Sequence, residues 1–485
     1  MRVAPIMDRF RSPAASDALK IVLGAAAFGV LFALISLFLD VRIAAAIIGA
    51  GVLVVACLRN VLVAGAMLAA AMLFSPELRL GDGIILRVED LIIPVLGLAV
   101  VAQVVIPRLG RPLRRSLPDL PVLAVLVVNA LASVRGVMAG SVEMLPSILW
   151  NGKILELFLV YWVTFNFVRD PGRVKQMLGV VLVVFLGVAL YACLQIPGTR
   201  VHSLQRLTAP FEGTPEPTTL GGYLTLISAV LIALALYEPS KTKKAAYWLM
   251  TAVVIFPILF TFSRTTYVSF GAMVLLLGLV TRHRSLTLVA AVALVLSPMI
   301  LPQSVIDRVQ MTFDVTRDYG LDPSLMERIS VWAKVQYSLG DSLLLGHGVP
   351  QGILDSQFAR ILIESGVLGM AAWVAVFAAC LAMGWRLLRR AEEPVHKALA
   401  AGYIVGTVSL IVHSLATITF YIVRIMEPFW FLTGLVASLD AYYRLRRPLS
   451  EEAHPEPDRD RSDGRGGNRA VQTSPATSLA RPPSR

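Results

Sequence analysis

Residues that build disulfide frameworks, metal sites and nucleotide-binding sites are scarce in this sequence. It has 3 cysteines and 6 histidines among 485 residues. The cysteines, Cys57, Cys193 and Cys380, are widely separated and odd in number, which fits neither a disulfide framework nor a metal-ligand spacing. The sequence has no Walker A motif, no HExxH motif and no GxGxxG motif that leads into a helix. We therefore expect no metal and no cofactor, and ATP-driven transport by this chain alone is disfavoured.

Charge is also sparse. Charged residues make up 16% of the chain and hydrophobic residues 56%, and the mean hydropathy is +0.72, far outside the range of soluble domains. Apolar runs of about 16 to 22 residues recur along the chain, each long enough to cross a bilayer core of about 30 Å. We predict an all-α polytopic membrane protein with about 14 transmembrane helices. The predicted spans are residues 20–39, 42–58, 60–74, 90–106, 119–135, 148–168, 175–195, 219–237, 245–262, 265–281, 285–300, 361–386, 398–419 and 426–443.

The net charge of +12 predicts a membrane orientation rather than nucleic-acid binding, because the basic residues form short clusters between the apolar runs. With the N-terminus in the cytoplasm, every cluster falls on the cytoplasmic side, and so does the C-terminus. The clusters are Arg108, Arg111, Arg114 and Arg115; Arg169, Arg173 and Lys175; Lys241, Lys243 and Lys244; Arg282 and Arg284; Arg386, Arg389, Arg390 and Lys397; and Arg444, Arg446 and Arg447.

The chain divides into a membrane domain, residues 1–448, and a tail, residues 449–485. The tail is rich in Pro, Ser, Gly, Arg and Glu and has almost nothing to bury, so we predict that it is disordered and cytoplasmic. The first apolar run is too long for a cleaved signal peptide, and we expect it to remain as a signal anchor.

The most polar interruption of the membrane domain is the predicted loop of residues 301–360, which the topology places on the outer side. It holds Arg308, Arg317, Arg328 and Arg360, although arginine is usually kept on the cytoplasmic side. An anionic substrate would explain them. Residues Leu325–Leu339 show apolar side chains at helical spacing, which predicts a helix within the loop.

Three arginines on the predicted outer side are candidates for a diphosphate clamp: Arg206, Arg264 and Arg328. A guanidinium group binds phosphate oxygens in a bidentate fork. Each arginine also has a simpler interpretation, since Arg206 can meet lipid phosphates, Arg264 can snorkel from a helix end, and Arg328 can lie on a solvated helix face beside Trp332.

Asp355 is our candidate for a general base acting on a sugar hydroxyl, and His347 is its rival. Asp355 also fits a helix N-cap, and His347, which lies between glycines, also fits a turn. Glu364 can support the site or pair with Arg360 one helical turn before it. His413 lies inside a predicted span, where polar packing against Ser409 or Thr417 is as good an explanation as function.

The order of these segments resembles the bacterial O-antigen ligase and polysaccharide polymerase superfamily. The segments that carry the resemblance are Leu86-Arg87-Val88-Glu89-Asp90-Leu91, the stretch from Arg206 to Gly222, Ser263-Arg264, Arg328 with Trp332, Gly346-His347-Gly348, and Asp355 with Glu364-Ser365-Gly366-Val367-Leu368-Gly369. Together they span most of the chain from Leu86 to Arg446.

The resemblance implies an all-helical membrane glycosyltransferase in the bacterial inner membrane. Such enzymes transfer a glycan from an undecaprenyl-diphosphate carrier to an acceptor hydroxyl at the periplasmic face, with neither a metal nor a nucleotide sugar. A flippase and chain-length regulator proteins would be further partners. The resemblance also implies catalytic roles for Asp355 and His347, diphosphate binding by Arg206, Arg264 and Arg328, and supporting roles for Trp332, Arg360 and Glu364.

One departure from the family pattern separates two functions. In the ligases a histidine, usually followed by Asn, stands where this chain has Asp355-Ser356. An acid there resembles the polymerases, which join lipid-linked repeat units. A polymerase is therefore our first interpretation and a ligase the second. A flippase or secondary transporter is the alternative from another class, disfavoured because no internal repeat is evident and the polar residues gather at the outer face.

Overall fold

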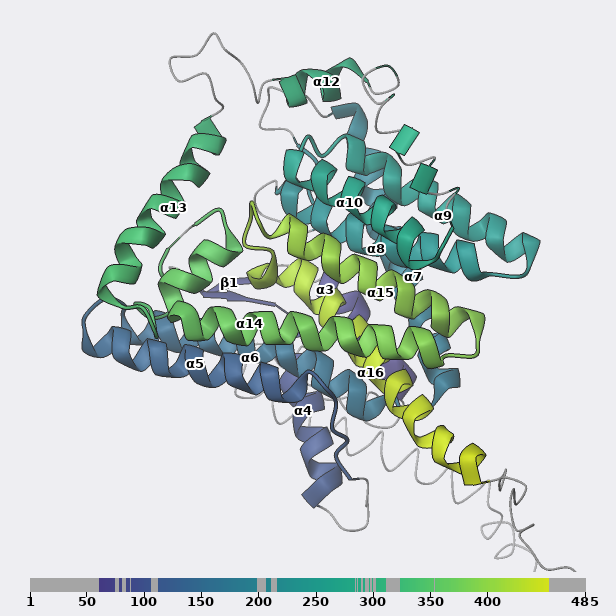
Figure 1. Ribbon diagram of the computed structural model, residues 1–485, viewed down its shortest axis with the longest axis horizontal. Helices are drawn as coiled ribbons and strands as arrows, with labels where there is room; N and C mark the ends of the chain where they lie inside the picture. The colour runs from purple at the N-terminus through teal and green to yellow at the C-terminus, as the bar shows by residue number, and fades with distance from the viewer. Residues whose placement is uncertain are drawn as a thin grey trace, which may run out of the picture. The chain divides into compact units, whose positions relative to one another are not determined.

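The computed structural model of the chain describes residues 61–74, 78–80, 84–87, 89–105, 112–198, 206–210, 216–283, 302–310, 323–352 and 354–452, with scattered residues between 285 and 299 (Figure 1). The predicted spans 20–39 and 42–58 lie outside these residues, as do most of 285–300 and the tail beyond 452.

The described chain is almost entirely helical. A helix satisfies its own backbone hydrogen bonds, which is what a segment crossing a bilayer requires. The elements are α3 (Val61–Phe74), β1 (Leu78–Leu80), β2 (Ile84–Leu86), α4 (Glu89–Val105), α5 (Asp119–Met138), α6 (Met144–Phe167), α7 (Pro171–Gln195), η2 (Ile196–Gly198), α8 (Pro217–Tyr237), α9 (Lys241–Leu259), α10 (Arg264–Val280), α12 (Gln303–Gln310), α13 (Pro323–Asp341), α14 (Gln357–Arg390), α15 (Pro394–His413), η4 (Thr419–Tyr421) and α16 (Val423–Glu452). Strands β1 and β2 pair as a short antiparallel hairpin.

Among the described residues, 7 helices are long and apolar enough to cross a membrane: α5, α6, α7, α8, α9, α14 and α15. Helix α10 is apolar but shorter. The prediction of a polytopic helical membrane protein is therefore confirmed, whereas the predicted number of about 14 spans is not reached by the described helices. Helix α16 continues to Glu452, past the predicted end of the membrane domain at residue 448.

Helix α8 forms the centre of the bundle. Its span is 94% buried within the protein, against 22% for α9 and 33% for α5, which expose apolar side chains as helices facing lipid do. Helix α15 packs closely on α8, because a Cβ atom at Gly402 would lie 2.7 Å from the Cα atom of Val230. Small residues permit such close approach between membrane helices.

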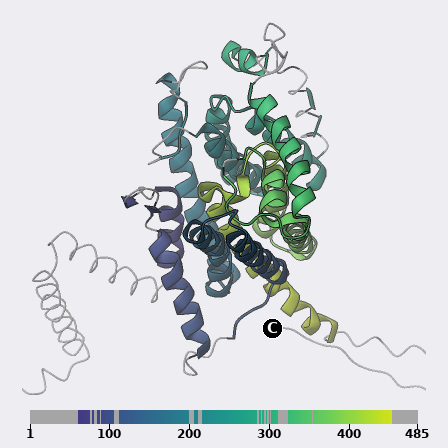
Figure 2. The same ribbon diagram turned by 90° about the vertical axis from the view of Figure 1, so that its left-hand side faces the viewer.

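The helices alternate in direction, so the bundle has two distinct ends. The first residues of α8, α10 and α14 lie at one end, together with the last residues of α5 and α15, and we call this the site end (Figures 1 and 2). The Gln357 N–H of α14, for example, donates to the Ser414 carbonyl after α15. At the opposite end Arg386 pairs with Asp440 and Arg114 donates to the Val168 carbonyl. The basic clusters of these segments thus lie away from the site end, as the alternation of charge predicts.

Helix α13 lies across the site end in Figure 1, crosswise to α14. It includes the helix predicted at Leu325–Leu339. Val331 and Val335 of α13 are buried against Ala359 and Ile363 of α14. This small apolar cluster attaches the polar segment to the bundle.

Candidate functional site

One of the candidate arginines lies at a helix start, and another lies in a segment that precedes a neighbouring helix. Arg264 is the first residue of α10, and Arg206 lies in the segment before α8. Ser263 Oγ donates to Thr218 Oγ1 at 3.2 Å, which joins the start of α10 to that of α8. Helix N-termini carry partial positive charge, so two adjacent starts favour an anion at this place.

Arg328 and Trp332 lie on α13. The backbone at Arg328 is helical, but its side chain lies outside what the structure describes. Trp332 is 46% exposed. The structure therefore brings the helix of Arg328 to the site end without placing its guanidinium group.

Helix α14 is broken at Gly366, which has φ 64° and ψ −160°. A broken helix leaves backbone groups without helical partners, and inside a membrane these must bond elsewhere. The turn that carries His347 supplies the partners. Four backbone bonds close the break: His347 N–H to the Ile363 carbonyl (2.8 Å), Gly348 N–H to the Glu364 carbonyl (2.9 Å), Val367 N–H to the Leu343 carbonyl (2.9 Å) and Leu368 N–H to the Leu344 carbonyl (3.2 Å).

Glycine is required on both sides of this contact. A Cβ atom at Gly366 would overlap the Leu344 carbonyl oxygen, and one at Gly346 would lie 2.5 Å from the Ile363 carbonyl oxygen. Both glycines also have positive φ, 64° and 62°, where other residues are strained. The Gly-His-Gly and Glu-Ser-Gly motifs of the sequence therefore form one structural contact.

Helix α5 holds the turn from its other side. Arg135 donates to the Gly346 carbonyl, and Ser141 Oγ donates to the His347 carbonyl at 2.6 Å. The turn is thus fixed between α5 and α14, and the position of the His347 ring is fixed with it.

The geometry of the His347 ring determines its tautomer. Nε2 lies 3.1 Å from the Ser338 carbonyl oxygen, which can only accept, so Nε2 carries the hydrogen. When the ring is neutral, Nδ1 therefore holds the lone pair and can take a proton. His347 is a turn residue, as one interpretation of the sequence has it, and its role as a base stays a prediction.

Asp355 does not act as the helix cap that its position suggests. The N-cap of α14 is Ser356, whose side chain makes no capping bond, and the first helical residue is Gln357. Asp355 is half-buried one residue further out. Its carboxylate has no hydrogen bond or ion pair in the described part of the chain. The capping interpretation is wrong, and Asp355 remains available at the site end.

Arg360 and Glu364 form the buried pair that their spacing predicts. Arg360 Nε donates to Glu364 Oε1 at 2.8 Å, and the two side chains are 2% and 0% exposed. The Trp150 and Tyr421 rings cover the guanidinium, each centred 4.7 Å from its Cζ. Tyr421 donates its hydroxyl to Glu364 Oε2 at 3.1 Å, and burial raises the pKa of Tyr421 well above its usual value, so the phenol stays protonated. The Gln351 N–H completes the shell of Glu364 at 3.1 Å.

His413 is buried at the end of α15, where Gly222 of α8 leaves room for its ring. Its Nδ1 lies 2.8 Å from Thr419 Oγ1. The polar packing expected for this residue is present, but with Thr419 rather than with Ser409 or Thr417.

A second group of charged side chains, partly or fully buried between α4, α6 and α16, was not identified from the sequence. Lys153 Nζ lies 2.6 Å from Asp90 Oδ1 and 2.7 Å from Glu156 Oε2. Glu89 and Glu427 are fully buried beside them. The available signal was the presence of Lys153, Glu156 and Glu427 inside predicted apolar spans, where ionisable residues are rare and costly.

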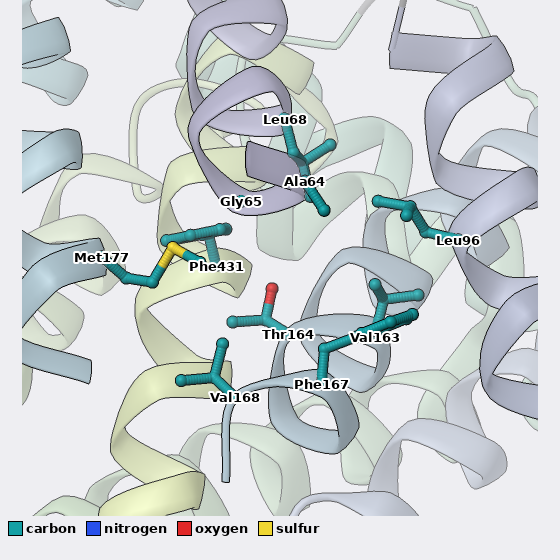
Figure 3. A pocket seen from close by; sticks show the side chains of 10 residues that line it. All are labelled: Ala64, Gly65, Leu68, Leu96, Val163, Thr164, Phe167, Val168, Met177 and Phe431. Carbon is teal, nitrogen blue, oxygen red and sulfur yellow. The ribbon is translucent and has the colours of Figure 1, made fainter. Parts of the chain in front are cut away.

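A pocket between α3, α4, α6, α7 and α16 contains none of the candidate residues (Figure 3). Thr164 contributes the polar side chain to a lining that is otherwise apolar or glycine. Its lining is Ala64, Gly65, Leu68, Leu96, Val163, Thr164, Phe167, Val168, Met177 and Phe431. Such a pocket suits no charged substrate, and the candidate site lies instead at the site end.

In the described part of the chain, no group of three or more His, Cys, Asp or Glu side chains is placed to hold a metal ion. No protein-family model matches the sequence, and no curated protein matches it either.

Proposed function

We propose that the protein is a polysaccharide polymerase that joins oligosaccharide repeat units carried on undecaprenyl diphosphate. The observation that carries the proposal is the arrangement of the site end. The starts of α8 and α10, with Arg264 at the second, lie at this end of a membrane bundle, and so does the carboxylate of Asp355 before α14, which has no partner among the described residues. An anionic lipid-linked donor and a base for the acceptor are what that arrangement fits.

The proposed step is a substitution at the anomeric carbon of the donor sugar. The acceptor hydroxyl oxygen forms a bond to that carbon, and the bond from the carbon to the diphosphate oxygen breaks. Asp355 takes the hydroxyl proton, with His347 as the rival base. The diphosphate leaves with the bonding electrons, and Arg206, Arg264 and Arg328 stabilise its charge. The supporting contacts of Arg360 and Glu364 keep the start of α14 in place.

The proposal places the site end at the periplasmic face of the bacterial inner membrane. The basic residues at the opposite end support this orientation, since arginine and lysine concentrate on the cytoplasmic side. Lys175 and Arg386 are examples, both far from Asp355 along the bundle.

Purified protein in liposomes, supplied with an undecaprenyl-diphosphate-linked repeat unit, tests the proposal. A polymerase yields lipid-linked chains of several units and releases undecaprenyl diphosphate. A ligase makes no polymer from this substrate and transfers a glycan only when a lipid or protein acceptor is added. If the substrate crosses the bilayer unchanged, the protein is a transporter and the proposal is wrong.

A secondary transporter is the second candidate, because the charged group of Lys153, Asp90 and Glu156 is partly buried between helices of the bundle. Ionisable groups in such places often belong to ion or proton pathways. Proton-driven uptake by liposomes that forms no new glycosidic bond would favour this candidate.

A further inference from the structure

Three donor groups at the start of α14 have no acceptor among the residues that the structure describes. They are the Ser356 hydroxyl, the Gln357 side-chain amide and the terminal nitrogens of Arg360. The three side chains are only 1%, 0% and 2% exposed. A buried donor without an acceptor is destabilising, so such groups in a native structure call for an explanation.

The orientation of the Gln357 amide is fixed by its neighbour. The Phe420 N–H donates to Gln357 Oε1 at 3.0 Å, so the oxygen must lie on that side. The amide nitrogen, Nε2, then points elsewhere and has no partner in the described part of the chain. Gln357 therefore offers two hydrogens to an absent acceptor.

The contacts that hold the Arg360 side chain leave the outer edge of its guanidinium group, which carries the two terminal nitrogens, without a described partner. Aromatic rings cover the guanidinium, and Nε is occupied by Glu364. The two terminal nitrogens make no hydrogen bond to any described residue. That edge is the fork with which arginine binds two oxygens of a phosphate or carboxylate.

Arg360 follows Gln357 by three positions, which places these two side chains on one face of α14, and Ser356 is the N-cap residue directly before Gln357. They also lie at a helix N-terminus, where the partial charge is positive. We propose that Ser356, Gln357 and Arg360 form an oxyanion-binding site at the start of α14. All three groups can donate, and the Arg360 guanidinium is positively charged, so an anionic ligand with oxygen acceptors satisfies them best.

The source of the oxyanion rests on the proposed function. Asp355, the proposed base, precedes this site in the chain. An oxyanion beside it would belong either to the diphosphate leaving group or to the carboxylate of an acidic sugar in the repeat unit. The shared chemistry is an anionic group with at least two oxygens.

Binding to the purified full chain in lipid nanodiscs tests the site, with inorganic diphosphate and glucuronate as separate probes in titration calorimetry. We expect one probe to bind and Arg360→Gln to weaken it by about 10- to 100-fold, the effect of losing one charge-assisted contact. Binding of diphosphate indicates the leaving group, and binding of glucuronate indicates an acidic sugar.

Gln357→Glu is the sharper variant. It keeps the oxygen that accepts from Phe420 and replaces the unpartnered amide with a carboxylate oxygen, so we expect a folded protein that no longer binds the probe. Gln336→Glu makes the same change on an exposed part of α13 and should bind as the parent does. Arg386→Gln removes a paired arginine at the opposite end and should also leave binding unchanged.

Glu364→Gln distinguishes a binding role of Arg360 from a purely structural one. If Arg360 serves a ligand, this variant keeps the probe or binds it more tightly, because a competing negative charge is gone. Equal loss in Arg360→Gln and Glu364→Gln would overturn the site, as would unchanged binding in Gln357→Glu or no binding of either probe. If Arg360→Gln does not fold, Arg360→Lys replaces it, with weaker binding expected because the fork is lost. A protein that binds a probe through these residues but makes no polymer would contradict the proposed function alone.

Discussion

The backbone N–H of His347 donates to the Ile363 carbonyl at 2.8 Å, across the break in α14. This bond makes the turn and the broken helix a single unit. A conformational change that closed the break would also have to displace His347. A movement of the turn away from α14 would leave the Ile363 and Glu364 carbonyls without their partners. The unit separates two halves of α14, of which the first presents Arg360 and Glu364.

Gly366→Ala should disrupt this unit. The new methyl group would overlap the Leu344 carbonyl and occupy a backbone conformation with φ 64° that suits glycine. We expect a loss of at least about 2 kcal/mol in the free energy of unfolding, or no folded protein at all. Gly179→Ala is the control, since nothing lies within 4 Å of its Cβ position. Thermal unfolding in detergent should show it equal to the parent or slightly more stable; a stable Gly366→Ala protein would contradict the clamped break.

Lys153→Met should destabilise the protein strongly. It leaves Asp90 and Glu156, which are 15% and 13% exposed, without the cation that now lies between them. Removing one member of a fully buried ion pair typically costs about 3–5 kcal/mol, and we expect about 2–3 kcal/mol for this partly buried group. Lys175→Met removes a lysine paired with Glu393 on the surface, where both side chains are more than 40% exposed, and should cost no more than about 1 kcal/mol. Equal melting temperatures for the two variants would show that the group of Lys153, Asp90 and Glu156 contributes little to the free energy of unfolding.

Asp355→Asn should lower the rate of polymerisation by about 100-fold or more, because the amide cannot take a proton. The melting temperature should stay at the parent value, since Asp355 makes no capping bond. Rates with purified enzyme and lipid-linked repeat unit measure the effect. Near-parent activity of this variant, together with an inactive His347→Ala, would assign the base role to His347.

Single changes of Arg206, Arg264 or Arg328 to Ala should abolish polymer while the protein remains in the membrane. Lysine at each position should rescue poorly, because it lacks the bidentate fork. The polymer is measured by gel and the protein by immunoblot of the membranes. Full activity in two of the three alanine variants is not compatible with a diphosphate clamp.

Lys334→Cys on α13 should react with a membrane-impermeant thiol reagent added to intact cells after the outer membrane has been made permeable. Lys243→Cys, an equally exposed lysine at the opposite end, should react only after the inner membrane is broken. This is the orientation that the basic clusters predict. The reverse pattern would place the candidate site in the cytoplasm and remove the basis of the proposed function.

The sequence was sufficient for features that depend on local pattern. The apolar runs predicted the helices α5 to α10, α14 and α15 with ends that differ from the observed ones by at most six residues, because a membrane span needs only length and composition. The spacing of Arg360 and Glu364 predicted their pairing for the same reason, since a helix brings these positions together.

Features that depend on distant segments could not be predicted in this way. The conformation of Gly366 is set by its approach to Leu344, which no local pattern encodes. Asp355 and Ser356 both suit a cap, and the chain path decides between them. The role of Lys153 depends on Asp90, which belongs to another helix.

The group formed by Lys153, Asp90 and Glu156 has a consequence for how the protein is made. Each ionised side chain near the middle of a helix opposes its release from the translocon into lipid, by about 2.5–3.5 kcal/mol for lysine or aspartate. Helix α6 carries both Lys153 and Glu156, and a partner for Lys153 arrives earlier in synthesis on α4. We therefore expect lateral release of α6 to depend on the prior presence of α4, so a ribosome-bound chain truncated after α6 should integrate both helices together, and deletion of α4 should reduce the integration of α6.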